Sequence, residues 1–148
     1  MLCSCERQEV ELLPWRAIGY YYQARFPSSW NVVENEAGLQ DSIQPVATLY
    51  LPNAATITLH LFREEVPPEM QIARWQKSFP TATVSYLSHG GYQGLMLKGE
   101  EILAVAMQLS PHYAKRFPDY TLKATGDIAP YQQEILEFIR TFELVDEL

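Results

Sequence analysis

The sequence predicts an α+β domain, in which helices cover an antiparallel β-sheet of about six to seven strands. Several short runs alternate apolar and polar residues, which is typical of strands with one covered face. Residues 131–142 instead place their apolar side chains on one helical stripe. Strands, a helix, more strands and a terminal helix follow one another along the chain, an order typical of the α+β class.

Length and composition predict one folded unit. The chain has 148 residues, of which 47% are hydrophobic and 20% are charged, so apolar burial can offset the entropy of folding. We expect a single domain over residues 15–148, preceded by a flexible segment over residues 1–14. The formal net charge of −7 argues against nucleic acid as a partner, because such binding depends on clustered Lys and Arg.

The first part of the domain predicts three strands. The aromatic run over residues 15–26 has no helical stripe and ends at Pro27. A polar loop is expected over residues 34–44. Strands are then expected over residues 47–51 and 55–62, and the second of these has the clearest alternation in the chain.

A short amphipathic helix is predicted from Pro67 onward. Ile72, Trp75 and Phe79 recur at spacings of three and four residues, which places them on one buried face. The side chains expected to face away from the core are Gln71, Arg74, Lys77 and Ser78.

Four further strands and a terminal helix complete the prediction. The strands are expected over residues 81–87, 92–98, 102–109 and 120–125, with an irregular insertion over residues 110–118. The run 102–109 is apolar throughout, which predicts a strand covered on both faces. The terminal helix carries Pro130 in its first turn and Asp127 as a candidate N-cap.

The cysteines and histidines predict neither a disulfide framework nor a metal site. Cys3 and Cys5 are the only cysteines, and they lie two positions apart at the N-terminus. The three histidines, His60, His89 and His112, share no ligand spacing with one another or with the cysteine pair. No cofactor is expected.

The N-terminal run Leu2-Cys3-Ser4-Cys5 resembles the lipobox of bacterial lipoproteins, in which a small residue precedes the cysteine that is acylated and becomes the mature N-terminus. Cys5 is therefore a candidate lipidation site and the only expected membrane attachment, because no other run is apolar enough to span a membrane. A signal peptide needs a basic region and an apolar region before cleavage, and only four residues precede Cys5. The lipobox interpretation therefore requires a longer reading frame; a start at Met1 favours a cytoplasmic chain.

An aromatic cluster near the N-terminus is the candidate partner-binding surface. Tyr20, Tyr21 and Tyr22 follow one another in the first predicted strand, and Trp30 follows shortly after it. Successive strand residues point to opposite faces, so at least one ring is expected on a surface. Exposed tyrosines are favoured at protein interfaces, and packing within the sheet is the alternative.

No residue pattern predicts catalysis. His60 lies on the polar face of an alternating strand, His89 lies in a turn, and His112 lies in the insertion. The adjacent pairs Glu64-Glu65 and Glu100-Glu101 are expected to be solvated turn charges, because two-carboxylate chemistry needs side chains that converge. The glycines match no phosphate-binding motif.

Three segments carry a family resemblance. The first is the run Phe26-Pro27-Ser28-Ser29-Trp30, and the second is a mid-chain helix before a glycine-containing hairpin (Gly91, Gly94). The third is a final strand, loop and helix over residues 120–142. Together they resemble segments of the PsbP/Mog superfamily. That superfamily includes an extrinsic photosystem subunit, the Ran-release factor Mog, small bacterial lipoproteins and secretion chaperones. The resemblance implies a PsbP/Mog-like fold and an accessory or binding role, and it carries over no binding residue.

These observations together predict a non-enzymatic accessory or protein-binding domain, in the form of a bacterial cell-envelope lipoprotein with a protein partner. One alternative is a cytoplasmic chaperone or adaptor for a secreted protein. The other is an enzyme, which would need a deep cavity at His112 or His60.

Overall fold

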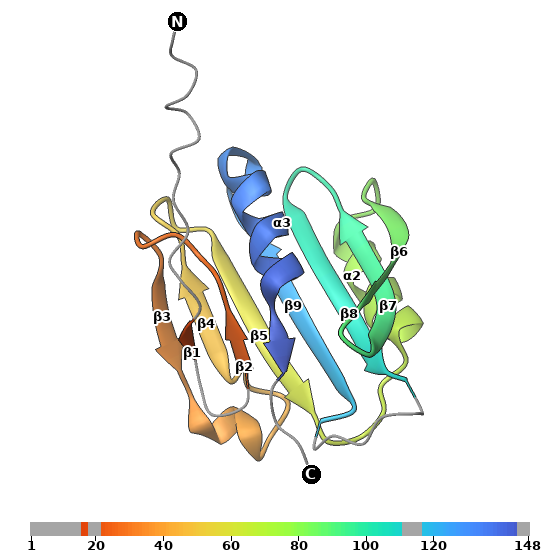
Figure 1. Cartoon of the computed structure of the whole chain (residues 1–148). Helices are drawn as coiled ribbons and strands as arrows, with labels where there is room; N and C mark the ends of the chain where they lie inside the picture. Colours follow the sequence, from red (N-terminus) through yellow and green to blue (C-terminus); the bar gives the residue numbers. More distant parts are fainter. Residues whose placement is uncertain (1–15, 18–21, 111–116, 145–148) are drawn as a thin grey trace, which may run out of the picture.

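The described part of the chain forms one large and one small antiparallel sheet. The computed structural model describes residues 16–17, 22–110 and 117–144. Within them, seven strands form one sheet in the order β3-β4-β5-β9-β8-β7-β6, and three short strands form a second in the order β1-β2-β10 (Figure 1). The predicted α+β class and antiparallel sheet of about seven strands are confirmed.

The strands and helices have the following bounds. The large sheet contains β3 (Asn31–Glu34), β4 (Ala47–Tyr50), β5 (Thr56–Phe62), β6 (Thr83–His89), β7 (Tyr92–Lys98), β8 (Ile102–Leu109) and β9 (Asp119–Thr125). The small sheet contains β1 (Arg16–Ala17), β2 (Tyr22–Ala24) and β10 (Glu143–Leu144). The helices are α2 (Pro68–Ser78) and α3 (Gln132–Thr141), with short 3-10 turns η1 (Glu36–Leu39) and η2 (Ala129–Tyr131).

Helices cover both faces of the large sheet. In Figure 1, α3 lies in front of β9, and α2 lies behind β7 and β8. Helix α2 packs on β7 and β8. It leaves the same face of β5 and β4 uncovered by a helix, which is why that half of the face is polar.

Strand β5 separates the two faces by simple alternation. Ile57, Leu59 and Leu61 are buried in the core beneath α3. Thr58 and His60 point to the opposite face and are half-buried. The alternation predicted over residues 55–62 is confirmed.

Strand β8 is buried on both faces, as its apolar sequence predicts. Leu103, Val105 and Met107 belong to the main core under α3. The alternate residues belong to a second cluster with Ile72 of α2: Ile102, Ala104 and Ala106. The small alanine side chains allow the helix to approach the sheet closely.

Helix α2 differs from its predicted pattern at one position. Ile72 is buried and Trp75 and Phe79 pack against the second cluster, as expected. Gln71 was expected to face away, and this is wrong, because its side chain is only 5% exposed. The helix covers β7 and β8 but not β5, so Gln71 on its flank is enclosed between the helix and the open half of the sheet.

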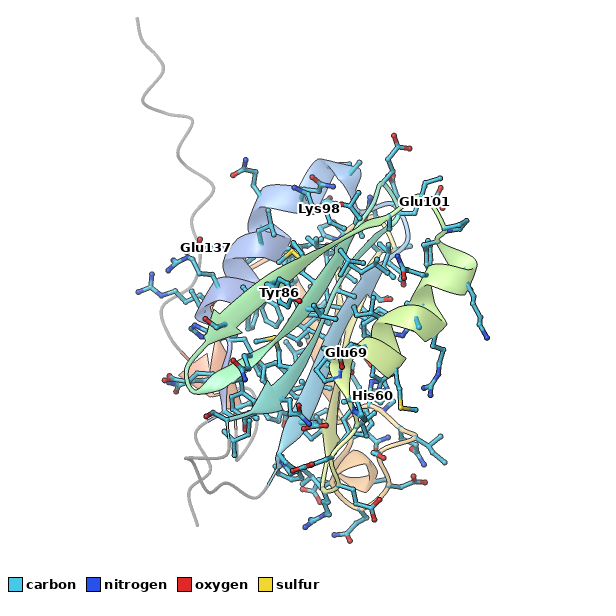
Figure 2. The ribbon with its side chains drawn as sticks, turned by 90° about the vertical axis from the view of Figure 1, so that its right-hand side faces the viewer. His60, Glu69, Tyr86, Lys98, Glu101 and Glu137 are labelled. Carbon is cyan, nitrogen blue, oxygen red and sulfur yellow. The ribbon has the colours of Figure 1, made fainter. Side chains whose placement is uncertain are left out.

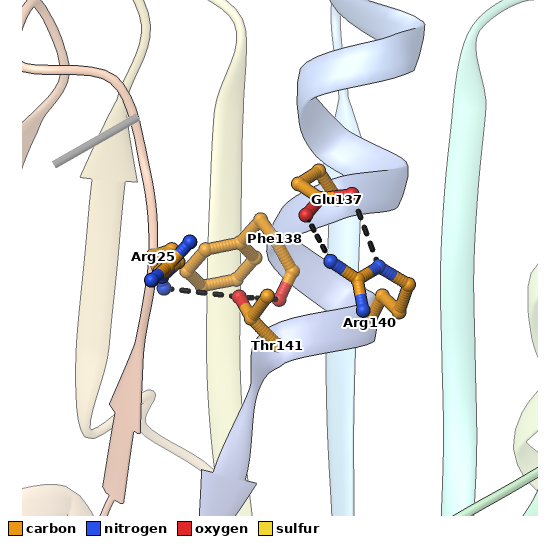
Figure 3. A network of polar contacts seen from close by, with 5 residues as sticks. All are labelled: Arg25, Glu137, Phe138, Arg140 and Thr141. Carbon is orange, nitrogen blue, oxygen red and sulfur yellow. Dashed lines mark hydrogen bonds and ion pairs between the residues drawn. The ribbon is translucent and has the colours of Figure 1, made fainter. Parts of the chain in front are cut away.

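Helix α3 is the predicted terminal helix. Ile135, Phe138 and Ile139 are buried against the sheet. Thr141 accepts a hydrogen bond from the backbone N–H of Arg25 at 3.0 Å and thereby ties β2 to α3 (Figure 3). The predicted N-cap is wrong: η2 precedes the helix, and the N-cap position is Tyr131, without a side-chain cap.

The N-terminal region differs most from its prediction. Instead of one strand over residues 15–26, the described residues form two short strands, β1 and β2, in which Arg16 pairs with Ala24 and Ala17 with Gln23. The region after it contains an unpredicted strand, β3, and the loop expected over residues 34–44 contains η1. Asn35 caps η1 by accepting the N–H of Ala37 at 3.0 Å, so a polar sequence folds into a local turn.

Candidate binding sites

The structure buries two of the four predicted partner-binding aromatics. Tyr22 and Trp30 are each 3% exposed. Tyr22 packs on Phe142, and Trp30 packs between Phe26 and Phe138. The prediction that these two rings form a binding surface is therefore wrong, because Tyr22 in β2 and Trp30 just before β3 both pack against aromatic rings in or directly after α3. Burial, together with a hydrogen bond to Glu34, also raises the pKa of Tyr22.

The other predicted site residues lie outside the described residues. These are Cys5, Tyr20 and Tyr21, together with Cys3 and His112. His89 ends β6, and its Nε2 atom lies 2.8 Å from the carbonyl oxygen of Phe142, so the imidazole ring links the β6–β7 hairpin to the end of α3.

Strand β6 forms one edge of the large sheet, and most of its residues are exposed. In the described residues it pairs with β7 alone. Tyr86 at its centre is 91% exposed and lies on the strand nearest the viewer in Figure 2. Val84 is also exposed. From Thr83 to His89 the strand contains no Lys, Arg, Asp, Glu or Pro, the residues that usually protect an edge.

The turn beyond β6 fixes which backbone groups face outward. Gly90 and Gly91 have φ values of 59° and 88°, which glycine adopts readily and which form the two-residue turn of a hairpin. His89 and Tyr92 flank this turn as a hydrogen-bonded pair, and the bond from Ser110 N–H to the Gly91 carbonyl agrees with that register. By alternation, the N–H and C=O groups of Val84, Tyr86 and Ser88 point away from β7.

The opposite edge of the sheet is protected. Strand β3 spans only Asn31–Glu34, and its last residue is charged. Short length and charge are two of the ways in which proteins prevent edge pairing. The contrast indicates that the open edge at β6 is a specific feature of this sheet and not a general property of its ends.

A shallow cavity of about 450 Å³ lies beside Tyr86. The start of α2, at Pro68 and Glu69, forms one wall. Leu95 on β7 and Gln108 on β8 contribute to the other side. Side chains that project from a strand added at β6 toward α2 would enter this cavity.

A second cavity of about 550 Å³, here called the α2 groove, lies between α2 and the uncovered half of the sheet. Helix α2 contributes Gln71, Arg74, Trp75 and Ser78, and Phe79 follows at its C-cap. Strands β5 and β9 contribute His60, Phe62, Thr121 and Lys123, and the loop before β4 contributes Ser42 and Ile43. Its wall is thus partly aromatic and partly polar.

The α2 groove is positively charged. Arg74 and Lys123 line it, and no Asp or Glu does. Within the described part of the chain neither cation forms an ion pair: Lys123 lies over the Trp75 ring, and Arg74 donates a hydrogen bond to Gln71 at 3.4 Å. Burial and the charge of Lys123 lower the pKa of His60, so this side chain is neutral at pH 7.

Sequence reasoning did not find the edge or the groove. The run Thr83–His89 carried a usable signal, because it has high β-propensity and no charge. The groove had no local signal, since its residues come from a helix, two strands and a loop.

No helix in the described ranges is long and apolar enough to cross a membrane. Among the same residues, no three His, Cys, Asp or Glu side chains are grouped so that they could hold a metal ion. No known protein family matches the chain, and no curated protein is detectably similar to it.

Proposed function

We propose that this chain is a non-catalytic protein-binding domain whose partner adds an extended segment to the edge of β6. The observation that carries the proposal is the open, uncharged edge around Tyr86, which is 91% exposed. Tyrosine supplies a large rigid contact area with a polar tip, which favours protein interfaces.

Strand addition uses groups that are already in place. The outward N–H and C=O groups of Val84, Tyr86 and Ser88 can pair with the backbone of an incoming segment. Alternate side chains of that segment would contact the cavity between Tyr86 and Pro68. Glu69 at the cavity wall and the net charge of −7 favour a segment that is uncharged or basic.

Site-specific photocrosslinking in the native cells tests this proposal. A photoreactive phenylalanine analogue replaces Tyr86 in one variant and Tyr50 in another, because Tyr50 is also exposed but lies on β4, which is paired on both sides. We expect one partner protein to crosslink at position 86 and not at position 50. Equal crosslinking at the two positions, or crosslinking only to a second copy of the chain, would overturn the proposal.

Two substitutions then test the binding mode with the purified partner. Tyr86→Lys should weaken binding about tenfold or more by placing a charge on the edge. Val84→Pro should also weaken it, because proline removes an outward N–H and no hydrogen bond of the β6–β7 ladder. Val84→Ala is the matched control and should bind nearly as well as the wild type.

We also propose that the domain is a lipoprotein of the bacterial cell envelope, anchored through Cys5. The lipobox resemblance of residues 2–5 supports this location. The intact mass of the product expressed from its native locus tests it: a diacyl or triacyl adduct at Cys5 is expected. An unmodified chain that starts at Met1 would support the cytoplasmic chaperone or adaptor instead, and the β6 edge would then bind the secreted protein.

The finer fold assignment, a PsbP/Mog-like domain, is part of the same proposal. Its support is the run Phe26–Trp30, whose two aromatic rings stack against each other with centroids 6.3 Å apart, and the closing succession of β9 and α3. Superposition of an experimental structure on members of that superfamily tests the assignment, and a different strand order would contradict it.

A further inference from the structure

The α2 groove combines positive charge with an aromatic wall. Lys123 enters it from β9 and Arg74 from α2, so the two cations approach from different elements. The ammonium group of Lys123 lies 5.7 Å from the centre of the Trp75 ring. In a chain of net charge −7, a cavity lined by two cations and no carboxylate is a local inversion of the overall charge.

The polar groups of the groove suit an anionic head group. The Arg74 guanidinium has five donors, of which one contacts Gln71, and Lys123 adds a second full positive charge. Hydroxyl groups of Ser78 and Thr121 line the same cavity. Arginine and lysine bind carboxylate, sulfonate and phosphate oxygens through charge-assisted hydrogen bonds.

The apolar wall suits a compact hydrophobic body next to that head group. Trp75 of α2 and Phe79 at its C-cap line the groove, as do Phe62 of β5 and Ile43. The volume of about 550 Å³ lies within the usual range of small-molecule sites. An inorganic anion would leave this apolar wall uncontacted, whereas an organic anion would contact both the cations and the apolar wall.

We propose that the α2 groove binds a small organic anion, in which one anionic group is joined to an aromatic or branched apolar body. The anionic group lies between Arg74 and Lys123, and the body packs on Trp75. This site is separate from the β6 edge and does not depend on the protein partner proposed above.

A pair of dyes tests the proposal on the full chain. 8-Anilinonaphthalene-1-sulfonate is an anion with an aromatic body, and N-phenyl-1-naphthylamine is a close neutral analogue. We expect the anionic dye to bind the wild type with one-to-one stoichiometry and more tightly than the neutral dye. The double variant Arg74→Gln/Lys123→Gln should bind the anionic dye more weakly, by a factor of about ten or more. Its affinity for the neutral dye should be unchanged.

A matched control separates the groove from general charge. Lys77→Gln/Lys98→Gln removes the same total charge from exposed positions that do not line the groove. It should leave the affinity for the anionic dye unchanged. Ser78→Glu places a carboxylate in the groove at an exposed helix position and should also weaken binding of the anionic dye. This variant tests the groove independently if the double variant folds poorly.

Three results would overturn the proposal. The first is that the wild type does not bind the anionic dye, or binds both dyes equally. The second is that the control variant loses as much affinity as the groove variant. The third is that Ser78→Glu binds the anionic dye as tightly as the wild type.

Discussion

The ammonium group of Lys123 lies 5.7 Å from the centre of the Trp75 ring, so a side chain of β9 and one of α2 meet across the α2 groove. The contact keeps Lys123 beside His60, whose pKa is lowered by burial and by this charge. Lys123 therefore both lines the groove and, together with burial, favours the neutral form of His60.

The first prediction concerns the pH dependence of binding in the groove. At pH 7 His60 is neutral, and acidification adds a third positive charge beside Lys123 and Arg74. We expect the affinity for the sulfonate dye to rise as the pH falls below the ordinary pKa of histidine, because a sulfonate stays ionised throughout. Fluorescence titrations between pH 8 and pH 5 measure the change.

Two variants identify the group that is responsible. His60→Gln should remove most of the rise in affinity. Asp119 of β9 pairs with Phe62 of β5 and also loses its charge in this pH range. Asp119→Asn therefore serves as the control, and its affinity for the dye should still rise on acidification because His60 is present. A pH profile that His60→Gln leaves unchanged would contradict the prediction.

The second prediction is that Asp119→Asn stabilises the domain at neutral pH. Asp119 is 2% exposed; one carboxylate oxygen accepts the N–H of Val66, and in the described residues the other has no hydrogen-bond partner. Burial raises the pKa of Asp119 to about 6. Because the folded state disfavours the charged carboxylate, the contribution of Asp119 to the stability of the fold is highest below about pH 4, where the group is neutral in both the folded and the unfolded chain. That contribution is lost as the pH rises through about 6 and the buried carboxyl group ionises.

The substitution removes the buried charge and keeps an acceptor for Val66. We expect a gain of about 1 to 3 kcal/mol in the free energy of unfolding at pH 7.5 and little gain at pH 4. Urea denaturation at both pH values measures it. Glu65→Gln, which removes an exposed neighbouring charge, should have a much smaller effect. A loss of stability in Asp119→Asn at pH 7.5 would show that the carboxylate is needed.

The third prediction concerns the close contact of Gly94 on β7 with β8. A Cβ atom at this position would lie 1.9 Å from the carbonyl oxygen of Ala106, which is backbone and cannot move aside. Gly94→Ala should therefore destabilise the domain by about 2 kcal/mol or more, or prevent folding. Thermal unfolding by circular dichroism measures this effect.

A glycine in the adjoining turn supplies the control. Gly90 has a φ of 59°, and a Cβ atom there would meet nothing within 4 Å. Asparagine tolerates this conformation well, so Gly90→Asn should change the stability by less than about 1 kcal/mol. Equal losses in the two variants would mean that β7 and β8 are not packed as closely as described.

Local signals were sufficient to predict β7 and β8 with the bounds that the structure shows. Gly90-Gly91 forms the turn before β7, and Gly99 lies in the turn between β7 and β8; turn chemistry depends on neighbouring residues alone. The buried stripe of α3 was equally readable, because Ile135, Phe138 and Ile139 recur at helical spacing.

Features that depend on the order of strands were not predictable in the same way. Strand β9 lies between β8 and β5, and its pairing with β5, which is distant in the sequence, brings Lys123 beside His60 and Trp75. The same limit explains why the burial of Tyr22 and Trp30 was not predicted. Alternation places residues on opposite faces of a strand, but it does not say which face a second sheet and a helix will cover.

The last prediction is that Phe138→Ala destabilises the domain by about 3 to 5 kcal/mol. The ring is fully buried beneath α3 and packs against Phe26, Trp30 and Phe142, with ring centroids between 5.9 and 6.4 Å apart. Removing it leaves a cavity that three other large rings line, and none of them can fill it without leaving its own contacts. Urea denaturation of the variant measures the loss.

Arg140→Ala, two residues along α3 from Phe138, is the control for that experiment. The Arg140 guanidinium pairs with Glu137 on the outer side of α3, and its side chain is 67% exposed (Figure 3). Exposed ion pairs contribute little because water and salt screen them, so Arg140→Ala should lower the free energy of unfolding far less than Phe138→Ala does. If Phe138→Ala unfolds at the same urea concentration as Arg140→Ala, the ring is not buried against the sheet, and the placement of α3 over β9 is wrong.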